Sequence, residues 1–354
     1  MISPKHINYI DFIIYKMLFK KKKYQTNDRN KIIIDIDDSV FVPIGTIPNL
    51  AYEAISLLHD GCDEITQSEG LILPEIIYDK NNQNIINFPF VYNFKTKTRS
   101  SNVNIQTNGI YPYRITDATD MDECSNLWIL SLNRFEEDPY NNEKTNFRSI
   151  IKAHYSERLN TLVFMSKYDI PNSNSTQGTP NFEGLVQVSK NIFIIFSDGF
   201  SVFNGQGIVA VTIRNNQAQV DEIKISVNGN VLTNEQYDEL QISTAFNTKD
   251  GIIFVPQNPE KLTSNVYTVS NKEICGIIEQ LEHTKNSLVM NAKNIKIEIH
   301  GDKRPGSVYE GIEAMTIDKH KNIYGLTEWS SYSNDVLTTT FSRPFNGKLI
   351  VNSK

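Results

Sequence analysis

Short apolar runs alternate with polar turn signals along the chain from about Lys31 onward. The runs are bounded by Asn, Gly, Asp or Pro, a pattern typical of an antiparallel all-β fold. Helical periodicity is confined to Thr233–Leu240 and Asn271–His283. We expect strands at Lys31–Asp37, Leu71–Tyr78, Ile86–Tyr92, Asn126–Leu132, Thr161–Ser166, Gly184–Ser189, Asn191–Ser197, Gly207–Ile213, Gln219–Val227, Gly251–Val255, Asn265–Val269, Ile295–His300, Ile312–Ile317, Asn322–Glu328, Val336–Phe341 and Lys348–Val351.

Two residue types dominate the 354-residue chain, which contains 45 Ile and 39 Asn. Ile favours buried strands, and Asn favours turns and the left-handed backbone positions within them. A genome biased toward A+T enriches the same residues, so composition by itself only favours a β-rich fold. The length is compatible with two domains or with one large β-domain.

A repeated hairpin organises these strands. A short apolar strand follows a turn residue at Asn126, Asn191, Asp250 and Asn322, at intervals of 65, 59 and 72 residues. Four-stranded blades that pack around a central channel produce such a period, so the repeat predicts a β-propeller with five or six four-stranded blades. Two packed β-sandwiches are the structural alternative. We expect one propeller domain over residues 31–354, preceded by a basic and apolar extension over residues 1–30.

A Glu-Gly-aliphatic motif precedes strands of this repeat at Glu69, Glu183 and Glu310. Gly permits a bulge or a close backbone approach where an innermost strand begins, which would place the preceding Glu at the channel mouth. The strand-terminal acids Asp198 and Glu328 would complete a ring of carboxylates. Like charges so arranged are unfavourable unless a cation binds or protons are shared, and oxygen ligands suit Ca²⁺ or Mg²⁺. The alternative is that each Glu caps its own strand.

A second acidic cluster lies just before Asn126, where another Glu-Gly pair is expected. Asp120-Met121 takes that place, and Asp120 is predicted to supply a further oxygen ligand. The alternative is a polar turn. The three cysteines form no CxxC pair, which excludes a zinc site made of thiolates.

Charge is unevenly distributed along the chain. Residues 1–31 carry a net charge of +6 and the remainder −12. The acidic body argues against nucleic acid as a partner, because phosphate contacts need clustered cations. Residues 7–23 combine an apolar run with four lysines, which suits peripheral contact with an anionic membrane or, alternatively, a packed first helix or a solvated extension. No signal peptide or transmembrane helix is recognisable, which favours a cytoplasmic over a secreted location, and we expect a monomer.

At the Glu-Gly-aliphatic repeat the sequence resembles the phytase-like (esterase-like activity of phytase) β-propeller family. It is similar, more distantly, to the calcium-dependent lactonase and gluconolactonase propellers. The resemblance implies a propeller with a divalent cation, Ca²⁺, near its channel, and hydrolysis of a phosphoester or a lactone. The segments that carry it are SEGLILPEIIYD, RITDATDMDECSNLWILS, FEGLVQVSKNIFIIFSD and YEGIEAMTIDKHKNIYGLTE.

Two functions follow from these features. The first is a metal-dependent hydrolase in which the cation activates water and Glu183 or Glu310 acts as general base. The alternative is a non-catalytic propeller that binds a protein or a glycan through its top-face loops. Either way, a small-molecule or protein ligand is expected at the channel mouth. The candidate metal ligands are Glu69, Asp120, Glu183, Asp198, Glu310 and Glu328.

Overall fold

The computed structural model describes most of the chain from Lys31 onward. The predicted extension over residues 1–30, the segment 7–23 and Asp198 lie outside the described residues. Within the described part, no helix is both long and apolar enough to cross a membrane. The described residues are 31–36, 52–58, 68–78, 85, 87–112, 114–132, 148–171, 182–197, 207–233, 236–237, 240, 242–256, 265–283, 288–300, 307–333 and 336–350.

The described strands form five antiparallel units of four strands, named units 1–5 in the following order. Unit 1 contains β2 (Tyr52–Leu57), β3 (Glu69–Pro74), β4 (Phe90–Asn93) and β5 (Thr98–Asn102). Unit 2 contains β7 (Arg114–Ala118), β8 (Asn126–Leu132), β9 (Arg148–Ser156) and β10 (Thr161–Asp169). Unit 3 contains β11 (Phe182–Ser189), β12 (Ile192–Ser197), β13 (Ile208–Arg214) and β14 (Gln217–Val227).

Unit 4 contains β16 (Ile242–Thr248), β17 (Gly251–Pro256), β18 (Asn265–Ser270) and β19 (Leu288–His300). Unit 5 contains β20 (Ser307–Ile317), β21 (Asn322–Ser333), β22 (Val336–Ile350) and the N-terminal strand β1 (Lys31–Ile36). The short strands β6 (Asn104–Gln106) and β15 (Asn230–Val231) pair with β10 and β14.

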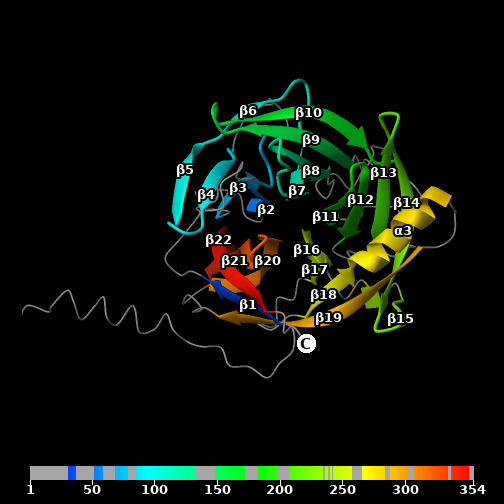
Figure 1. The fold of residues 1–354 in the computed structure, drawn as a ribbon. Coiled ribbons are helices and arrows are strands. Elements are labelled where there is room, and N and C mark those ends of the chain that lie inside the picture. Colours follow the sequence, from blue (N-terminus) through cyan, green and yellow to red (C-terminus); the bar gives the residue numbers. More distant parts are fainter. Residues whose placement is uncertain are drawn as a thin grey trace, which may run out of the picture.

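The units stand around a common centre (Figure 1), and β2, β7, β11, β16 and β20 are the strands nearest to it. Each of these innermost strands contacts the next one around the ring, and β20 contacts β2, so the ring is closed. Apolar cores fill the spaces between neighbouring units. This is the architecture of a β-propeller, and it confirms the predicted all-β propeller fold.

The outer strands join units together. β1 pairs antiparallel with β22, where Ile32 faces Leu349, and parallel with β19, where Ile32 faces Ile297. The other end of β19 pairs in parallel with β14. Units 3, 4 and 5 are therefore continuous through their outer edges, in one 13-stranded sheet.

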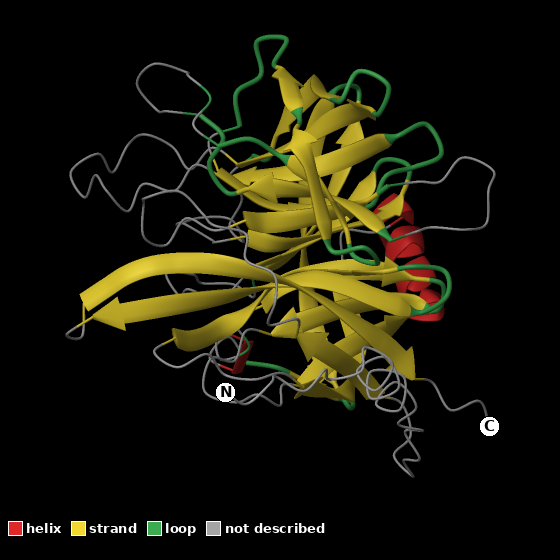
Figure 2. Ribbon diagram, turned by 90° about the vertical axis from the view of Figure 1, so that its left-hand side faces the viewer, coloured by secondary structure: helices red, strands yellow, loops and turns green. Residues whose placement is uncertain are grey.

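The helix α3 (Asn271–His283) confirms the second predicted helix and lies on the outside of the strands (Figure 2). Its Ile274 and Ile277 are buried in the core formed with units 3 and 4. At the other predicted helix, Thr233–Leu240, the described residues show its start. The backbone N–H of Gln236 donates to the Thr233 hydroxyl, and the Thr233 N–H donates to the Gln236 side chain. This reciprocal pair is a capping box.

The predicted hairpin repeat is the pair of first and second strands in units 2–5. In unit 5 the Asp318 carboxylate accepts hydrogen bonds from the backbone and the side chain of Asn322. Asp122 holds Asn126 in the same way in unit 2. In these two turns, the residues with positive φ are Ser125 and Lys321, each directly before the Asn. Each Asn therefore closes the turn through its side chain.

Every innermost strand contains a bulge at one equivalent place. The register shifts across Glu53 in β2, Thr116 in β7, Glu183 in β11, Ser243 in β16 and Glu313 in β20. The residue after each bulge is small or short: Ala54, Asp117, Gly184, Thr244 or Ala314. At Gly184 a Cβ atom would lie 3.1 Å from the Cβ of Ala245 on the next innermost strand. The close approach of these strands explains the glycine at position 184.

Substitution of Gly184 by Val should therefore destabilise the protein by about 1–3 kcal/mol, because the added methyl groups meet the next strand. Gly276 in α3 is the matched control, since a Cβ atom added there would have no atom of the described residues within 4 Å outside its own helix. Gly276→Val should change the free energy of unfolding by less than about 0.5 kcal/mol. Urea denaturation of both variants measures this, and equal effects would contradict the packing argument.

Candidate functional site

The five bulge residues bring three carboxylates to the centre of the ring. Glu53, Glu183 and Glu313 come from units 1, 3 and 5, and all three are buried. One carboxylate oxygen from each lies within 4.8 Å of the other two. The equivalent Thr116 donates a 2.6 Å hydrogen bond to the Phe182 carbonyl, and Ser243 donates one to the Val255 carbonyl. We call the three glutamates the central carboxylates.

Two further acids stand beside the central carboxylates. Glu75 follows Pro74, which pairs with Tyr52, and Glu328 follows Thr327, which pairs with Ile312. Glu75 and Glu328 thus occupy equivalent positions relative to the second strands of their units. Each directly follows the residue that pairs with the last residue before the bulge. The Glu75 charge acts on Glu53 and the Glu328 charge acts on Glu313. Units 1 and 5 each contribute a pair of neighbouring carboxyl groups.

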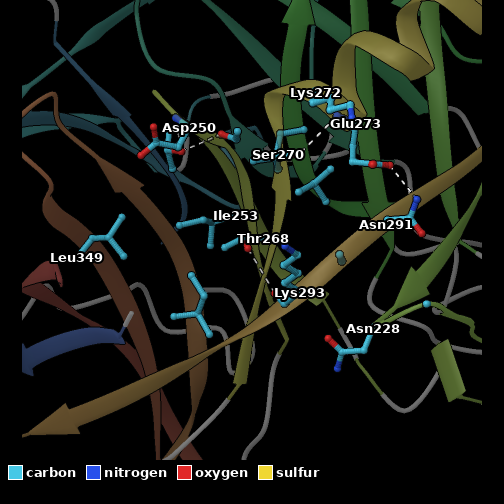
Figure 3. Close-up of a pocket in the computed structure, with 17 residues that line it drawn as sticks. Asn228, Asp250, Ile253, Thr268, Ser270, Lys272, Glu273, Asn291, Lys293 and Leu349 are labelled. Carbon is cyan, nitrogen blue, oxygen red and sulfur yellow. Dashed lines mark hydrogen bonds between the residues drawn. The ribbon is translucent and has the colours of Figure 1, made fainter. Parts of the chain in front are cut away.

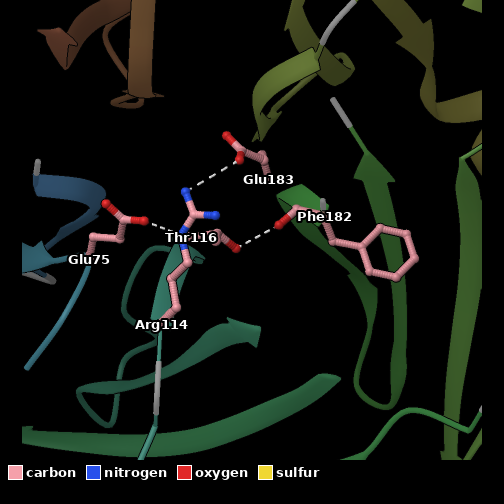
Figure 4. Close-up of polar contacts among 5 residues, drawn as sticks. All are labelled: Glu75, Arg114, Thr116, Phe182 and Glu183. Atoms are coloured by element: carbon pink, nitrogen blue, oxygen red, sulfur yellow. Dashed lines mark hydrogen bonds and ion pairs between the residues drawn. The ribbon is translucent and has the colours of Figure 1, made fainter. Parts of the chain in front are cut away.

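Arg114 provides positive charge to this group (Figure 4). Its Nε forms an ion pair with Oε1 of Glu75, and its Nη2 lies 3.8 Å from Oε1 of Glu183. Burial acts to lower the pKa of Arg114, but the charges of Glu75, Glu53 and Glu183 outweigh it and raise the pKa. Arg114 therefore stays charged and links units 1 and 3 across the first strand of unit 2.

Burial raises the pKa of the acidic groups. It is the largest cause for Glu53 and Glu313, whose pKa values lie well above the ordinary value, and the neighbouring carboxylates raise them further. Burial also raises the pKa of Glu75 to about 7, against the opposing effect of Arg114. These shifts favour the protonated forms of Glu53, Glu75 and Glu313.

Two aspartates, Asp117 in β7 and Asp120 just after it, tie innermost strands together. Buried Asp117 accepts a 2.6 Å hydrogen bond from the Leu185 N–H on the next innermost strand. Asp120 accepts hydrogen bonds from the Leu57 N–H at 2.9 Å and from the Thr316 hydroxyl at 2.7 Å. Asp120 thus connects units 2, 1 and 5 and is outside the group formed by the central carboxylates.

The sequence-predicted site residues divide between this centre and other places. Glu183 is a central carboxylate and Glu328 lies beside one. Glu69 lies on the second strand of unit 1 and accepts a hydrogen bond from the Asn93 side chain, outside the central group. Glu310 is in β20, three residues before Glu313. Asp198 follows Ser197, the partner of Phe182, outside the described residues.

The structure also corrects the alignment of the repeat. Thr116-Asp117, rather than Asp120-Met121, occupies the Glu-Gly place in unit 2, because the bulge lies between Ile115 and Asp117. Glu53 and Glu313 were not predicted. Their motifs, YEAI and IEAM, match FEGL once any small residue is allowed after Glu. Glu75 and Arg114 carry no local signal of this kind.

A separate cavity of about 550 Å³ lies where the β16–β17 turn, the start of α3 and β19 meet (Figure 3). Charged side chains from Asp250, Lys272, Glu273 and Lys293 line it above an apolar floor that includes Ile253. Positive and negative groups balance there, and the cavity shares no residue with the central group. The centre of the ring is therefore the stronger candidate site.

Asp120 and Asp122, in the connection between β7 and β8, should make the free energy of unfolding depend on pH in opposite directions. Burial raises the pKa of Asp120 to about 6, so its stabilising contribution is complete below about pH 4 and is lost as the pH rises through 6. For Asp122, burial acts to raise the pKa, but hydrogen bonds from Asn126 and Cys124 outweigh it and lower the pKa. Its contribution is present above pH 4 and is lost in acid.

Between pH 4 and 7, Asp120→Asn should gain about 1–2 kcal/mol of stability relative to wild type, because one pKa unit corresponds to about 1.4 kcal/mol and solvent reaches part of this side chain. Asp122→Asn should be less stable than wild type by a constant amount over this range, and the difference should shrink as the pH falls below about 4. Urea unfolding at several pH values measures both. An Asp120→Asn curve parallel to wild type between pH 4 and 7, or an Asp122→Asn curve parallel to it below pH 4, would contradict the assignment.

No protein-family model and no curated protein sequence matches the chain. Solved structures that align with it include a gluconolactonase from Xanthomonas campestris, at 8% identity, covering 80% of this chain and 70% of that one, with a TM-score of 0.36. The soluble aldose sugar dehydrogenase of Escherichia coli aligns at 10% identity, covering 84% and 95%, with a TM-score of 0.41. The major allergen Mala s 1 of Malassezia sympodialis aligns at 10% identity, covering 84% and 92%, with a TM-score of 0.38. These values assign no family, so the phytase-like resemblance stays a prediction.

Proposed function

We propose that the central carboxylates bind a divalent cation, with Ca²⁺ as the first candidate, and that the protein uses it to hydrolyse a small-molecule lactone or phosphoester. The observation that carries this proposal is the convergence of Glu53, Glu183 and Glu313, with oxygens within 4.8 Å of one another. The donors fit such an ion, because Ca²⁺ and Mg²⁺ prefer carboxylate oxygens.

Electrostatic repulsion supports the need for a cation. Two unit charges 4.8 Å apart repel by about 3.5 kcal/mol at an effective dielectric constant of about 20. Three such pairs approach the whole free energy of folding of a typical domain, about 5–15 kcal/mol. Arg114 supplies one positive charge for the three central carboxylates, Glu75 and Glu328. A divalent cation would neutralise much of the charge that remains on the described acids, as bound protons would.

A cation held there would polarise a carbonyl or phosphoryl oxygen of the substrate and lower the pKa of bound water. The protein's own part is to hold the ligand oxygens on three strands whose bulges fix them, and to accept a proton. Glu183 and Glu310 remain the proposed general bases, on β11 and β20. The three-strand origin of the ligands ties the site to the closed ring.

Glu183→Gln and Glu313→Gln should each weaken Ca²⁺ binding at least about tenfold, because each removes a negatively charged ligand. Isothermal titration with Ca²⁺, Mg²⁺ and Mn²⁺ measures the affinity, and a calcium-dependent rise in melting temperature provides a second readout. Glu279→Gln, on the exposed face of α3, is the matched control and should bind like wild type.

Turnover is measured on aldonolactones and on p-nitrophenyl phosphate, with and without Ca²⁺. Loss of turnover in the same two variants supports the hydrolase. Cation binding without turnover on either panel would reject the hydrolase and favour a propeller that binds a protein or a glycan. Absence of cation binding in the wild type would reject the metal site itself.

A further inference from the structure

Arg114 and the proposed cation share a carboxylate. Glu183 is one of the three central carboxylates, and the same oxygen, Oε1, faces Nη2 of Arg114 at 3.8 Å. A cation bound by Glu183 would bring two positive charges close to the guanidinium. The two cations therefore compete for one ligand, and this inference rests on the proposed function.

The two ion pairs of Arg114 differ in closeness. The pair with Glu75 is a direct contact through Nε, whereas the 3.8 Å distance to Glu183 is near the limit of an ion pair. The Glu53 carboxyl group shares a hydrogen bond with Glu75 in the cation-free protein. A cation that bound Glu53 would remove this contact, so the guanidinium could leave Glu183 and bind both oxygens of Glu75, in the bidentate geometry that arginine favours with carboxylates.

The backbone that follows Arg114 in β7 is held by hydrogen bonds to unit 1 and to unit 3. The Ile115 N–H donates a 2.7 Å hydrogen bond to the Glu75 carbonyl, and the Thr116 hydroxyl holds β7 against Phe182 of β11 (Figure 4). A change in the position of the guanidinium therefore needs only rotation of its own side chain. The strand that carries Arg114 keeps its place in the ring.

We propose that Arg114 is a specificity-determining residue that competes with the divalent cation for Glu183 and thereby sets the affinity of the site. In the cation-free protein, the guanidinium neutralises part of the charge of Glu75 and Glu183. When a divalent cation binds, the guanidinium releases Glu183 and keeps Glu75. The site then retains only cations whose interaction with the three carboxylates exceeds that of the arginine, which favours divalent over monovalent ions.

Arg114→Met tests the competition. The variant should bind Ca²⁺ at least about tenfold more tightly than wild type, because a positive charge next to the ligand is removed. Its cation-free form should melt at a lower temperature, and saturating Ca²⁺ should raise its melting temperature by more than that of wild type. Arg114→Lys, which keeps the charge but loses the bidentate geometry, should have an intermediate affinity.

Arg148→Met is the matched control. Arg148 is also buried, and its guanidinium lies 5.4 Å from the centre of the Phe182 ring rather than among the acids. This variant should lose stability without a change in Ca²⁺ affinity. Isothermal titration and thermal melting of all four proteins, at one pH and ionic strength, supply the readouts.

Each outcome decides between the two proposals. If wild type binds Ca²⁺ and Arg114→Met binds it equally or less tightly, the competition is rejected and the proposed metal site stands. If only Arg114→Met binds, the arginine excludes the ion from the native protein, which rejects both the proposed cation site and the inference that Arg114 sets its affinity. If neither protein binds Ca²⁺, Mg²⁺ or Mn²⁺, both proposals are rejected.

Discussion

The mutual approach of the five innermost strands is the constraint on which the rest of the structure depends. Each strand bulges at the same height, so five side chains are directed by the same local geometry, and three of them are glutamates. The next position must be small because the neighbouring strand is in contact with it, as at Gly184. The arrangement that closes the ring therefore also brings the central carboxylates together.

The structure meets the resulting repulsion with groups from neighbouring units. Arg114 enters between Glu75 and Glu183 and offsets part of their charge. Asp117 is a further buried acid nearby, and the backbone N–H of Leu185 on the adjacent innermost strand stabilises it. Such buried contacts are unfavourable to break, since one unpaired partner remains in a dry environment. The polar centre and the apolar cores between units consequently depend on each other: the cores hold the strands in register, and the polar contacts allow charged residues between them.

Sequence patterns predicted the hairpin turns and the outer helix better than the innermost strands. The hairpins at Asn126 and Asn322 and the helix α3 were predicted, because turn residues and helical periodicity are local signals. The innermost strands β2, β7 and β16 were not predicted, since both of their faces are buried and a polar bulge residue interrupts any alternation. The Glu-Gly motif did not identify Glu53, because Ala54 takes the position after the bulge that Gly184 takes in unit 3. Arg114 lies near Glu183 because the ring brings units 2 and 3 together. The spacing of these residues in the sequence gives no sign of that contact.

The pairing of β1 with β22 also has a kinetic consequence. Ile32 and Leu349 face each other although more than 300 residues separate them in the chain. On the ribosome, the first strand of the domain is made long before its partner, and it must wait for most of the polypeptide to emerge. Pairing of such distant segments is entropically costly and slow, so we expect the docking of β1 to be the last step of folding. Until then β19 presents an unpaired edge, which makes this interval the period in which the nascent protein is most exposed to aggregation.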